Sequence, residues 1–199
     1  MKRIALLLAG SFLLIANVSF SQAIDDRTVV PVAVTLNSIL RLNVVSGGNI
    51  EFNFNTLADY TSGINNSAAY DTKLTIASSV DWDLIMYAED ATLIGTDDAT
   101  GGNTLPLDYI GYNISADGAN DETVVDIPSF ATTRALSNTE IAIVGYDGTN
   151  SNAGDINANA YTIHWRCATG EGDSFGNLLT EGAAADRYAT NVFLILQPN

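Results

Sequence analysis

Residues 160–167 read Ala-Tyr-Thr-Ile-His-Trp-Arg-Cys, in which apolar and polar side chains alternate without a break from Tyr161 to Cys167. Side chains on a β-strand point alternately to its two faces, so this period of two predicts a strand with one buried and one polar face. The expected buried face carries Tyr161, Ile163, Trp165 and Cys167, and the polar face carries Thr162, His164 and Arg166.

The same alternation recurs along the chain, and no helical periodicity extends beyond two turns. The predicted strands cover residues 28–36, 39–45, 50–55, 72–78, 82–88, 107–115, 123–127, 140–146, 160–167 and 188–196. Segments rich in Asn, Asp, Gly, Ser and Thr separate them and predict turns and loops. The sequence therefore predicts an all-β fold, a two-sheet antiparallel β-sandwich of about 8–10 strands, immunoglobulin-like or jelly-roll-like.

Two short turns, 47–49 and 79–81, predict hairpins, because a slip of one residue would move apolar side chains to the polar face. The first hairpin would pair Val44 with Phe52 and Leu42 with Phe54. The second would pair Ile76 with Leu84 and Leu74 with Met86. Trp82 and Trp165 are then expected in one core with Leu42, Val44, Phe52, Phe54, Ile76, Leu84, Ile163 and Val192.

The N-terminal residues 1–23 read as a secretory signal peptide. Two basic residues precede an apolar run of about a dozen residues, and small residues lead to a cleavage site after Ala23. The alternative is a retained membrane anchor. Residues 24–199 are expected to form a single domain with no later membrane span. The protein is thus predicted to be exported, to the extracellular space, the cell surface or the periplasm.

The charge balance excludes several classes of function. Eight basic and 23 acidic residues give a formal charge of −15, which would repel nucleic acid. One cysteine excludes an intramolecular disulfide, and one histidine leaves few residues for acid–base chemistry. The composition therefore favours a non-enzymatic protein.

Two residue pairs are candidate catalytic centres. His164 and Cys167 lie three positions apart on one predicted strand, so their side chains would point to opposite faces and could not form a dyad. Asp81 and Asp83 flank Trp82, and paired carboxylates beside an aromatic ring are found in glycoside hydrolases. No apolar pocket is evident to raise the pKa of either acid, so a secreted hydrolase ranks third among the hypotheses.

Acidic loops offer oxygen ligands of the kind that Ca²⁺ binds outside cells. The candidate ligands are Asp97, Asp98, Asp147 and Asp155. Ordinary turn formation accounts for the same residues without a metal, and no other cofactor is expected.

Two tyrosines fall on the polar side of their predicted strands, Tyr87 and Tyr109. Flat exposed rings are suited to stacking on sugars, so both are candidate ligand-binding residues. The high β-propensity of tyrosine is the alternative explanation.

The predicted strand at residues 28–36 has one apolar stripe, and Pro31 removes a hydrogen-bond donor, which restricts the strand to a sheet edge. The stripe consists of Val30, Val32, Val34 and Leu36. Such a strand can pair within its own chain or with the open edge of a neighbouring copy. The sequence leaves both alternatives open.

Residues 77–118 contain the triplet Trp82-Asp83-Leu84 within a strand, loop and strand pattern. This segment resembles secreted bacterial β-sandwich surface proteins of the fimbrial and WxL types. Residues 185–199 resemble the last core strand of secreted proteins of Bacteroidetes-like bacteria. The resemblance implies an extracellular structural module and carries over no catalytic residue.

The sequence as a whole favours a non-enzymatic, exported structural or surface-assembly protein, with a pilin-like filament subunit as the sharpest version. Its expected partners are further copies of itself or other surface proteins. The alternative is a carbohydrate-binding or adhesive module that binds glycans and uses Ca²⁺.

Overall fold

A computed structural model of the 199-residue chain describes residues 28–97, 102–171 and 176–199. The predicted signal peptide, residues 1–23, lies outside the described residues. The chain divides into two units, Met1–Leu36 and Asn37–Asn199, of which the second is the compact β unit. Within the described ranges, no helix has the length and apolar character needed to cross a membrane.

The compact unit is built mainly of β-strands. Its strands are β1 (Leu40–Ser46), β2 (Asp71–Ser78), β3 (Trp82–Ala88), β4 (Thr92–Gly95), β5 (Thr104–Pro106), β6 (Ile110–Ala116), β7 (Val125–Asp126), β8 (Arg134–Ala135), β9 (Ile141–Tyr146), β10 (Ala160–Cys167), β11 (Tyr188–Ala189) and β12 (Val192–Pro198). The helices are short: α2 (Leu57–Ser62), α3 (Leu178–Glu181) and the 3₁₀ turns η1 (Ala68–Tyr70) and η2 (Leu107–Tyr109).

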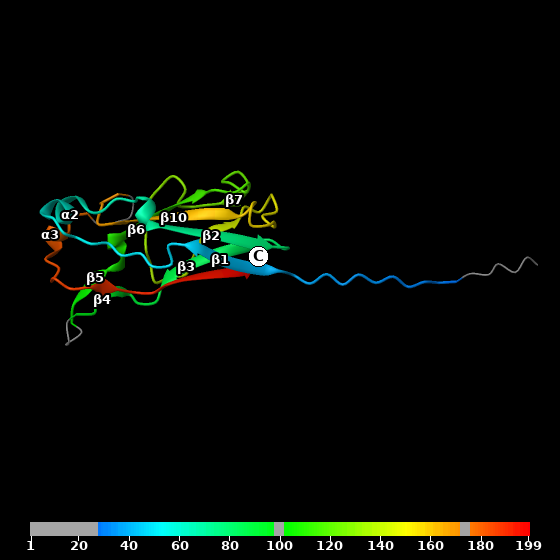
Figure 1. Ribbon diagram of the computed structural model, residues 1–199, viewed down its shortest axis with the longest axis horizontal. Coiled ribbons are helices and arrows are strands. Elements are labelled where there is room, and N and C mark those ends of the chain that lie inside the picture. The colour runs from blue at the N-terminus through cyan, green and yellow to red at the C-terminus, as the bar shows by residue number, and fades with distance from the viewer. Residues whose placement is uncertain (1–27, 98–101, 172–175) are drawn as a thin grey trace, which may run out of the picture. The chain divides into compact units, whose positions relative to one another are not determined.

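The strands form three antiparallel sheets (Figure 1). Their orders are β1-β2-β10-β6-β8, β12-β3-β9-β7 and β11-β4-β5. The predicted all-β, sandwich-like fold is therefore confirmed. Strands β4, β5 and β8 were not predicted, because they have only two to four residues each and show little readable alternation. Strand β7 lies within the predicted strand 123–127, and the predicted strand 188–196 is divided into β11 and β12.

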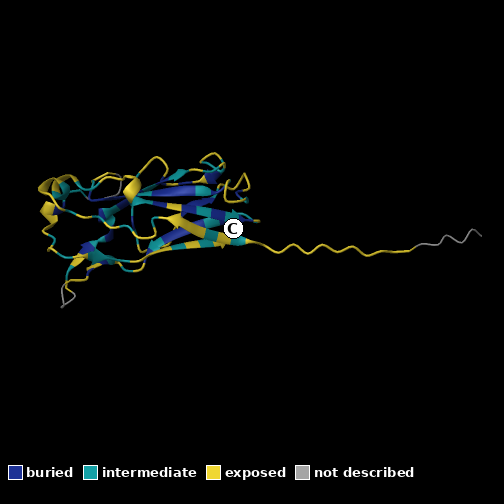
Figure 2. Ribbon diagram, in the orientation of Figure 1, coloured by how far each residue is buried: buried dark blue, intermediate teal, exposed yellow. Residues whose placement is uncertain are grey.

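Strand β10 occupies the middle of the five-stranded sheet, between β2 and β6. Its apolar face is buried as predicted, with Ile163 fully buried opposite Ile114 and Trp165 opposite Tyr112. Figure 2 shows β10 as one of the most buried strands. A central strand is covered by neighbours on both sides, so even its polar-face residue Thr162 is 2% exposed.

The core contains both tryptophans, as predicted. Trp82 is fully buried, and its indole lies edge-on to the Tyr161 ring with a centroid distance of 6.0 Å. Other predicted core residues that are buried are Ile76, Leu84 and Ile163, whereas Leu42, Phe52 and Phe54 are only partly buried against the core. Val44 and Val192 are 42% and 37% exposed, so their predicted burial is wrong.

The predicted hairpin between residues 39–45 and 50–55 does not form. The pairing edge of β1 is taken by β2, with Leu42 opposite Ile76, and residues 50–55 form no strand. Phe52 instead packs on the Tyr70 ring at 4.5 Å between centroids. The alternation of apolar and polar residues indicates which side chains are buried. It does not identify which other strand forms the backbone hydrogen bonds.

The predicted hairpin at residues 79–81 is wrong for a related reason. Strands β2 and β3 belong to different sheets, so the turn carries the chain across the sandwich. Ser78 Oγ accepts a hydrogen bond from the Val80 amide at 3.1 Å inside this turn. The four residues predicted to pair, Leu74, Ile76, Leu84 and Met86, are nevertheless all buried in the shared core.

The predicted strand at residues 28–36 is also absent. These residues have no regular secondary structure, and β1 begins at Leu40. Pro31 has no amide hydrogen, which weakens any ladder that it could join.

Candidate functional site

The edge of the five-stranded sheet is incompletely covered at β1. Val44 is 42% exposed, although its cross-strand partner Leu74 is 1% exposed. Directly opposed residues of an antiparallel pair lie on the same face, so Val44 points towards the core. Leu42 likewise faces the fully buried Ile76 and is itself only half-buried.

The edge of the four-stranded sheet shows the same feature at β12. Leu194 and Leu196 pair with the buried residues Met86 and Leu84 but are only half-buried themselves. Strands β1 and β12 end their sheets and lie side by side in Figure 1. We call this surface the open edge. It comprises the core-facing residues Leu40, Leu42 and Val44 of β1 and Val192, Leu194 and Leu196 of β12.

Strand β12 is also apolar on its outer face. Phe193 and Ile195 are 41% and 38% exposed, and they pair with Tyr87 and Ile85 of β3. The Phe193 and Tyr87 rings stack with a centroid distance of 5.2 Å. The sequence of β12, Val-Phe-Leu-Ile-Leu-Gln-Pro, contains no charge, whereas β1 carries Arg41. Charged residues protect edge strands from pairing with other chains, and β12 has none.

Residues 28–36 carry the apolar stripe predicted from the sequence, and it is exposed. The exposed fractions of Val30, Val32, Val34 and Leu36 are 75%, 85%, 79% and 89%. None of these residues belongs to a strand of its own chain. The segment is thus an alternating apolar sequence with no strand pairing and no buried apolar face.

The two candidate tyrosines have different environments. Tyr87 lies on the outer face of β3, as predicted, and stacks on Phe193. Tyr109 is 2% exposed and donates a hydrogen bond to Glu181 at 3.0 Å, so its predicted exposure is wrong. Burial and the neighbouring Glu181 raise the pKa of Tyr109 to about 12. Tyr109 belongs to the 3₁₀ turn η2, where the alternation of a strand does not apply.

Two of the candidate calcium ligands accept hydrogen bonds from backbone amides of their own loops. Asp147 Oδ1 accepts from the amides of Thr149 and Asn150 at 2.7 and 2.8 Å, and these bonds lower the pKa of Asp147. Asp155 accepts from two loop amides in the same way, with the same effect on its pKa. Asp97 is exposed, and Asp98 lies outside the described residues. Across residues 28–97, 102–171 and 176–199, no three acidic, histidine or cysteine side chains cluster to hold a metal.

The pair Asp81 and Asp83 has structural partners. Asp81 accepts from the Ser151 hydroxyl at 2.6 Å, and Asp83 accepts from the Tyr146 amide at 3.0 Å. These contacts join the start of β3 to the end of β9 and to the loop that follows β9. The geometry therefore gives the third hypothesis, a hydrolase built on this pair, no support.

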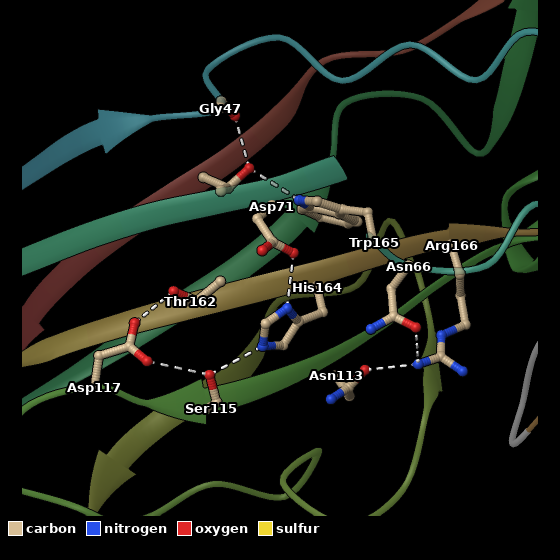
Figure 3. A network of polar contacts seen from close by, with 11 residues as sticks. Gly47, Asn66, Asp71, Asn113, Ser115, Asp117, Thr162, His164, Trp165 and Arg166 are labelled. Carbon is tan, nitrogen blue, oxygen red and sulfur yellow. Dashed lines mark hydrogen bonds and ion pairs between the residues drawn. The ribbon is translucent and has the colours of Figure 1, made fainter. Parts of the chain in front are cut away.

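A chain of polar side chains crosses the outer face of the five-stranded sheet (Figure 3). His164 Nδ1 lies 2.7 Å from an Asp71 oxygen, and His164 Nε2 lies 2.9 Å from the Ser115 hydroxyl. The Ser115 hydroxyl also donates to Asp117 at 3.5 Å, and Asp117 accepts a second hydrogen bond from Thr162 at 2.5 Å. The side chains of His164 and Asp71 are 24% and 12% exposed, so the network is partly shielded from water.

Neighbouring polar residues on this face are held in a second cluster. The Arg166 guanidinium donates to Asn66 at 3.1 Å and to Asn113 at 2.9 Å, and it pairs with Glu171. Cys167 points to the opposite, buried face, and burial raises the pKa of its thiol to about 12. His164 and Cys167 therefore do not meet, in agreement with the sequence.

The sequence predicts His164 on the polar face of its strand, but it does not predict the two partners of His164. Asp71 and Ser115 are 93 and 49 residues away, on strands that flank β10 only in the folded sheet.

No family model and no curated protein matches this chain. Function is therefore inferred from the geometry of the chain itself.

Proposed function

We propose that this protein is a non-enzymatic, exported structural subunit that assembles on or outside the cell by donating residues 28–36 to the β12 edge of another copy. The observation that carries the proposal is the coexistence of an unpaired alternating segment and an uncharged, half-covered edge strand. Within the described residues, the segment pairs with no strand, and no further strand pairs with the free edge of β12. One copy of the chain can therefore supply the strand that a second copy is missing.

The segment fits this edge in length and in both faces. Nine residues, 28–36, suffice to run along the seven residues of β12. Val30, Val32, Val34 and Leu36 would lie beside Leu194 and Leu196, and each apolar side chain that becomes fully buried contributes about 1.5–3 kcal/mol. The opposite face of the segment, with Pro31, Ala33 and Thr35, is small enough to lie beside the exposed outer face of β12.

Donation by every copy to the next produces a head-to-tail contact, which propagates into a filament unless the rotation closes a ring. This supports the pilin-like version of the proposal and an assembly of identical subunits. The strong negative charge of the chain, −15 in total, favours solubility of the free subunit until the edge is filled.

The first experiment removes residues 24–36 from the mature protein and adds them back as a free peptide. We expect the full chain to form concentration-dependent oligomers in analytical ultracentrifugation and filaments in electron microscopy. The truncated chain should remain monomeric and bind the peptide. The proposal would be refuted if the full chain stays monomeric at high concentration and the truncated chain does not bind the peptide.

A pair of substitutions tests the alternation. Val32→Asp places a charge on the apolar stripe and should abolish assembly, whereas Ala33→Asp on the other face should weaken it far less. On the acceptor, Val192→Lys lies on the core-facing side that the apolar stripe would contact and should block assembly, whereas Val45→Lys on β1 should not. Equal effects of Val32→Asp and Ala33→Asp would contradict donation as a strand.

A second candidate function is glycan binding, favoured by the stacked rings of Tyr87 and Phe193 on the outer face of the four-stranded sheet. Each stacked ring covers one face of the other, so a sugar would pack on a ring face that the stack leaves uncovered. Loss of binding on a glycan array after Tyr87→Ala, but not after Tyr60→Ala, would support it. An array with no binding above background would exclude this function for the glycans tested.

A further inference from the structure

The polar network on the outer face of the five-stranded sheet has the geometry of an activated hydroxyl. His164 Nδ1 lies 2.7 Å from the Asp71 carboxylate, which in its ionised form can only accept, so Nδ1 carries a proton. In the neutral ring, Nε2 then has a free lone pair, and it lies 2.9 Å from the Ser115 oxygen. The Asp117 oxygen, which can accept the same hydroxyl proton, is farther away at 3.5 Å. A hydroxyl, a base and a carboxylate that orients the base are the parts of a nucleophilic centre.

The sheet register holds these three groups together. His164 pairs directly with Asp71 of β2 on one side and with Asn113 of β6 on the other, and Ser115 is two residues further along β6. All three therefore project from the same face of adjacent strands. Three hydrogen-bonded strands position them, which is more rigid support than a loop provides.

The proposed reacting residues are partly exposed. Ser115 is half-buried and the His164 side chain is 24% exposed, so neither lies in the core. Other charged groups on this face are Asp117, Lys73 and Arg166. Lys73 is exposed and pairs with Thr162, which in turn pairs with Ser115. Two strand spacings, about 9.6 Å, separate Lys73 from Ser115, and a lysine side chain can cover much of that distance.

We propose that Ser115 is a nucleophile that takes one acyl group from an ester, with His164 as general base, Asp71 as a positioning residue and the Lys73 ammonium offsetting the negative charge of the intermediate. The Ser115 oxygen forms a bond to the ester carbonyl carbon, and the bond from that carbon to the leaving oxygen breaks. The serine proton passes to His164 Nε2 and then to the leaving group, which departs as an alcohol. No electrons are exchanged with another reagent.

The reaction is a stoichiometric acylation, which is compatible with a structural protein because it attaches a group and needs no turnover. It goes beyond the proposed assembly and is independent of it. The chain truncated before residue 37 retains β2, β6 and β10, so it should react in the same way as the full chain.

The test incubates the folded protein with p-nitrophenyl acetate and measures acetylation by intact mass and peptide mapping. We expect one acetyl group on Ser115 and none there in Ser115→Ala. His164→Gln keeps a hydrogen-bonding side chain without the base and should slow the labelling about 100-fold. Asp71→Asn should slow it and alter its dependence on pH, and Lys73→Met should slow it several-fold. Ser46→Ala, an exposed serine on β1, is the matched control and should change nothing.

Three outcomes would overturn the proposal. They are acetyl groups on amines alone, labelling of Ser115 no faster than that of Ser46, and an unchanged rate in His164→Gln. Circular dichroism and tryptophan emission establish that each variant is folded. Ser115→Ala removes only a half-buried hydroxyl, so it is expected to fold even if a substitution of His164 does not.

Discussion

The surroundings of Trp82 and the open edge use the same apolar residue types with opposite results. Trp82 is fully buried, and Asn152 accepts from its amide at 3.0 Å and donates to its carbonyl at 2.8 Å. The indole nitrogen donates to the Asn152 carbonyl at 2.9 Å. At the open edge, Val44 and Val192 face the same core yet remain 42% and 37% exposed. The first region stabilises the subunit, whereas the second leaves apolar surface available for a partner.

The sharpest test of this difference is Trp82→Ala. It removes the largest fully buried side chain and the hydrogen bond from the indole to the Asn152 carbonyl, so we expect the free energy of unfolding to fall by about 3–5 kcal/mol. Urea unfolding followed by the emission of Trp165 measures this change. Val45→Ala, at a position 59% exposed, is the control and should cost little. A loss below about 1 kcal/mol for Trp82→Ala would contradict the position of Trp82 in the core.

Two residues that face each other across β1 and β2 test the contrast within a single pair. Leu74→Ala should lower the free energy of unfolding by about 2–5 kcal/mol, because Leu74 is 1% exposed. Val44→Ala should cost less than about 1 kcal/mol, because nearly half of its side chain is already in water. Urea denaturation of the two variants checks both values. Equal losses would mean that the open edge is as well covered as the core.

Asn152→Ala isolates the polar part of the Trp82 region. Its removal leaves the buried amide and carbonyl of Trp82 without these partners, so we expect a loss of about 2–3 kcal/mol in the free energy of unfolding. Differential scanning calorimetry should record a lower Tm. Asn53→Ala, at an exposed position, is the control. A Tm equal to that of the control would show that water replaces the Asn152 side chain.

The smallest effect concerns the exposed loops rather than either region. Backbone amides of Asn150 and Thr149 hold the pKa of Asp147 below its value of about 3.9 in the unfolded chain. This contribution to stability is therefore complete above about pH 4 and is lost as the pH falls through the lower, folded pKa. Carboxyl titration by NMR should place Asp147 below model peptides. A midpoint at or above that of the peptides would contradict the loop geometry, and Asp147→Asn should reduce the acid sensitivity of the fold.

The sequence predicted the features that depend on side-chain alternation. Strands β3 and β10 have the predicted bounds, and the buried and polar faces of β10 are assigned correctly. The sequence predicted less well which strands are neighbours in a sheet, as the two incorrect hairpins show. Phe52 and Phe54 alternate like a strand because their rings pack on Tyr70 and Tyr60, and no hydrogen-bond ladder is required for that.

What the sequence alone determined is the all-β class and the apolar stripe of residues 28–36, since both follow from the period of two and from local chemistry. Tertiary structure decided which strands become neighbours, and with that the exposed edge of β12 and the meeting of Asp71, His164 and Ser115. The physical reason is that an antiparallel ladder can form between any two strands of suitable pattern. The choice among them depends on how both sheets together enclose a core, which no local segment encodes.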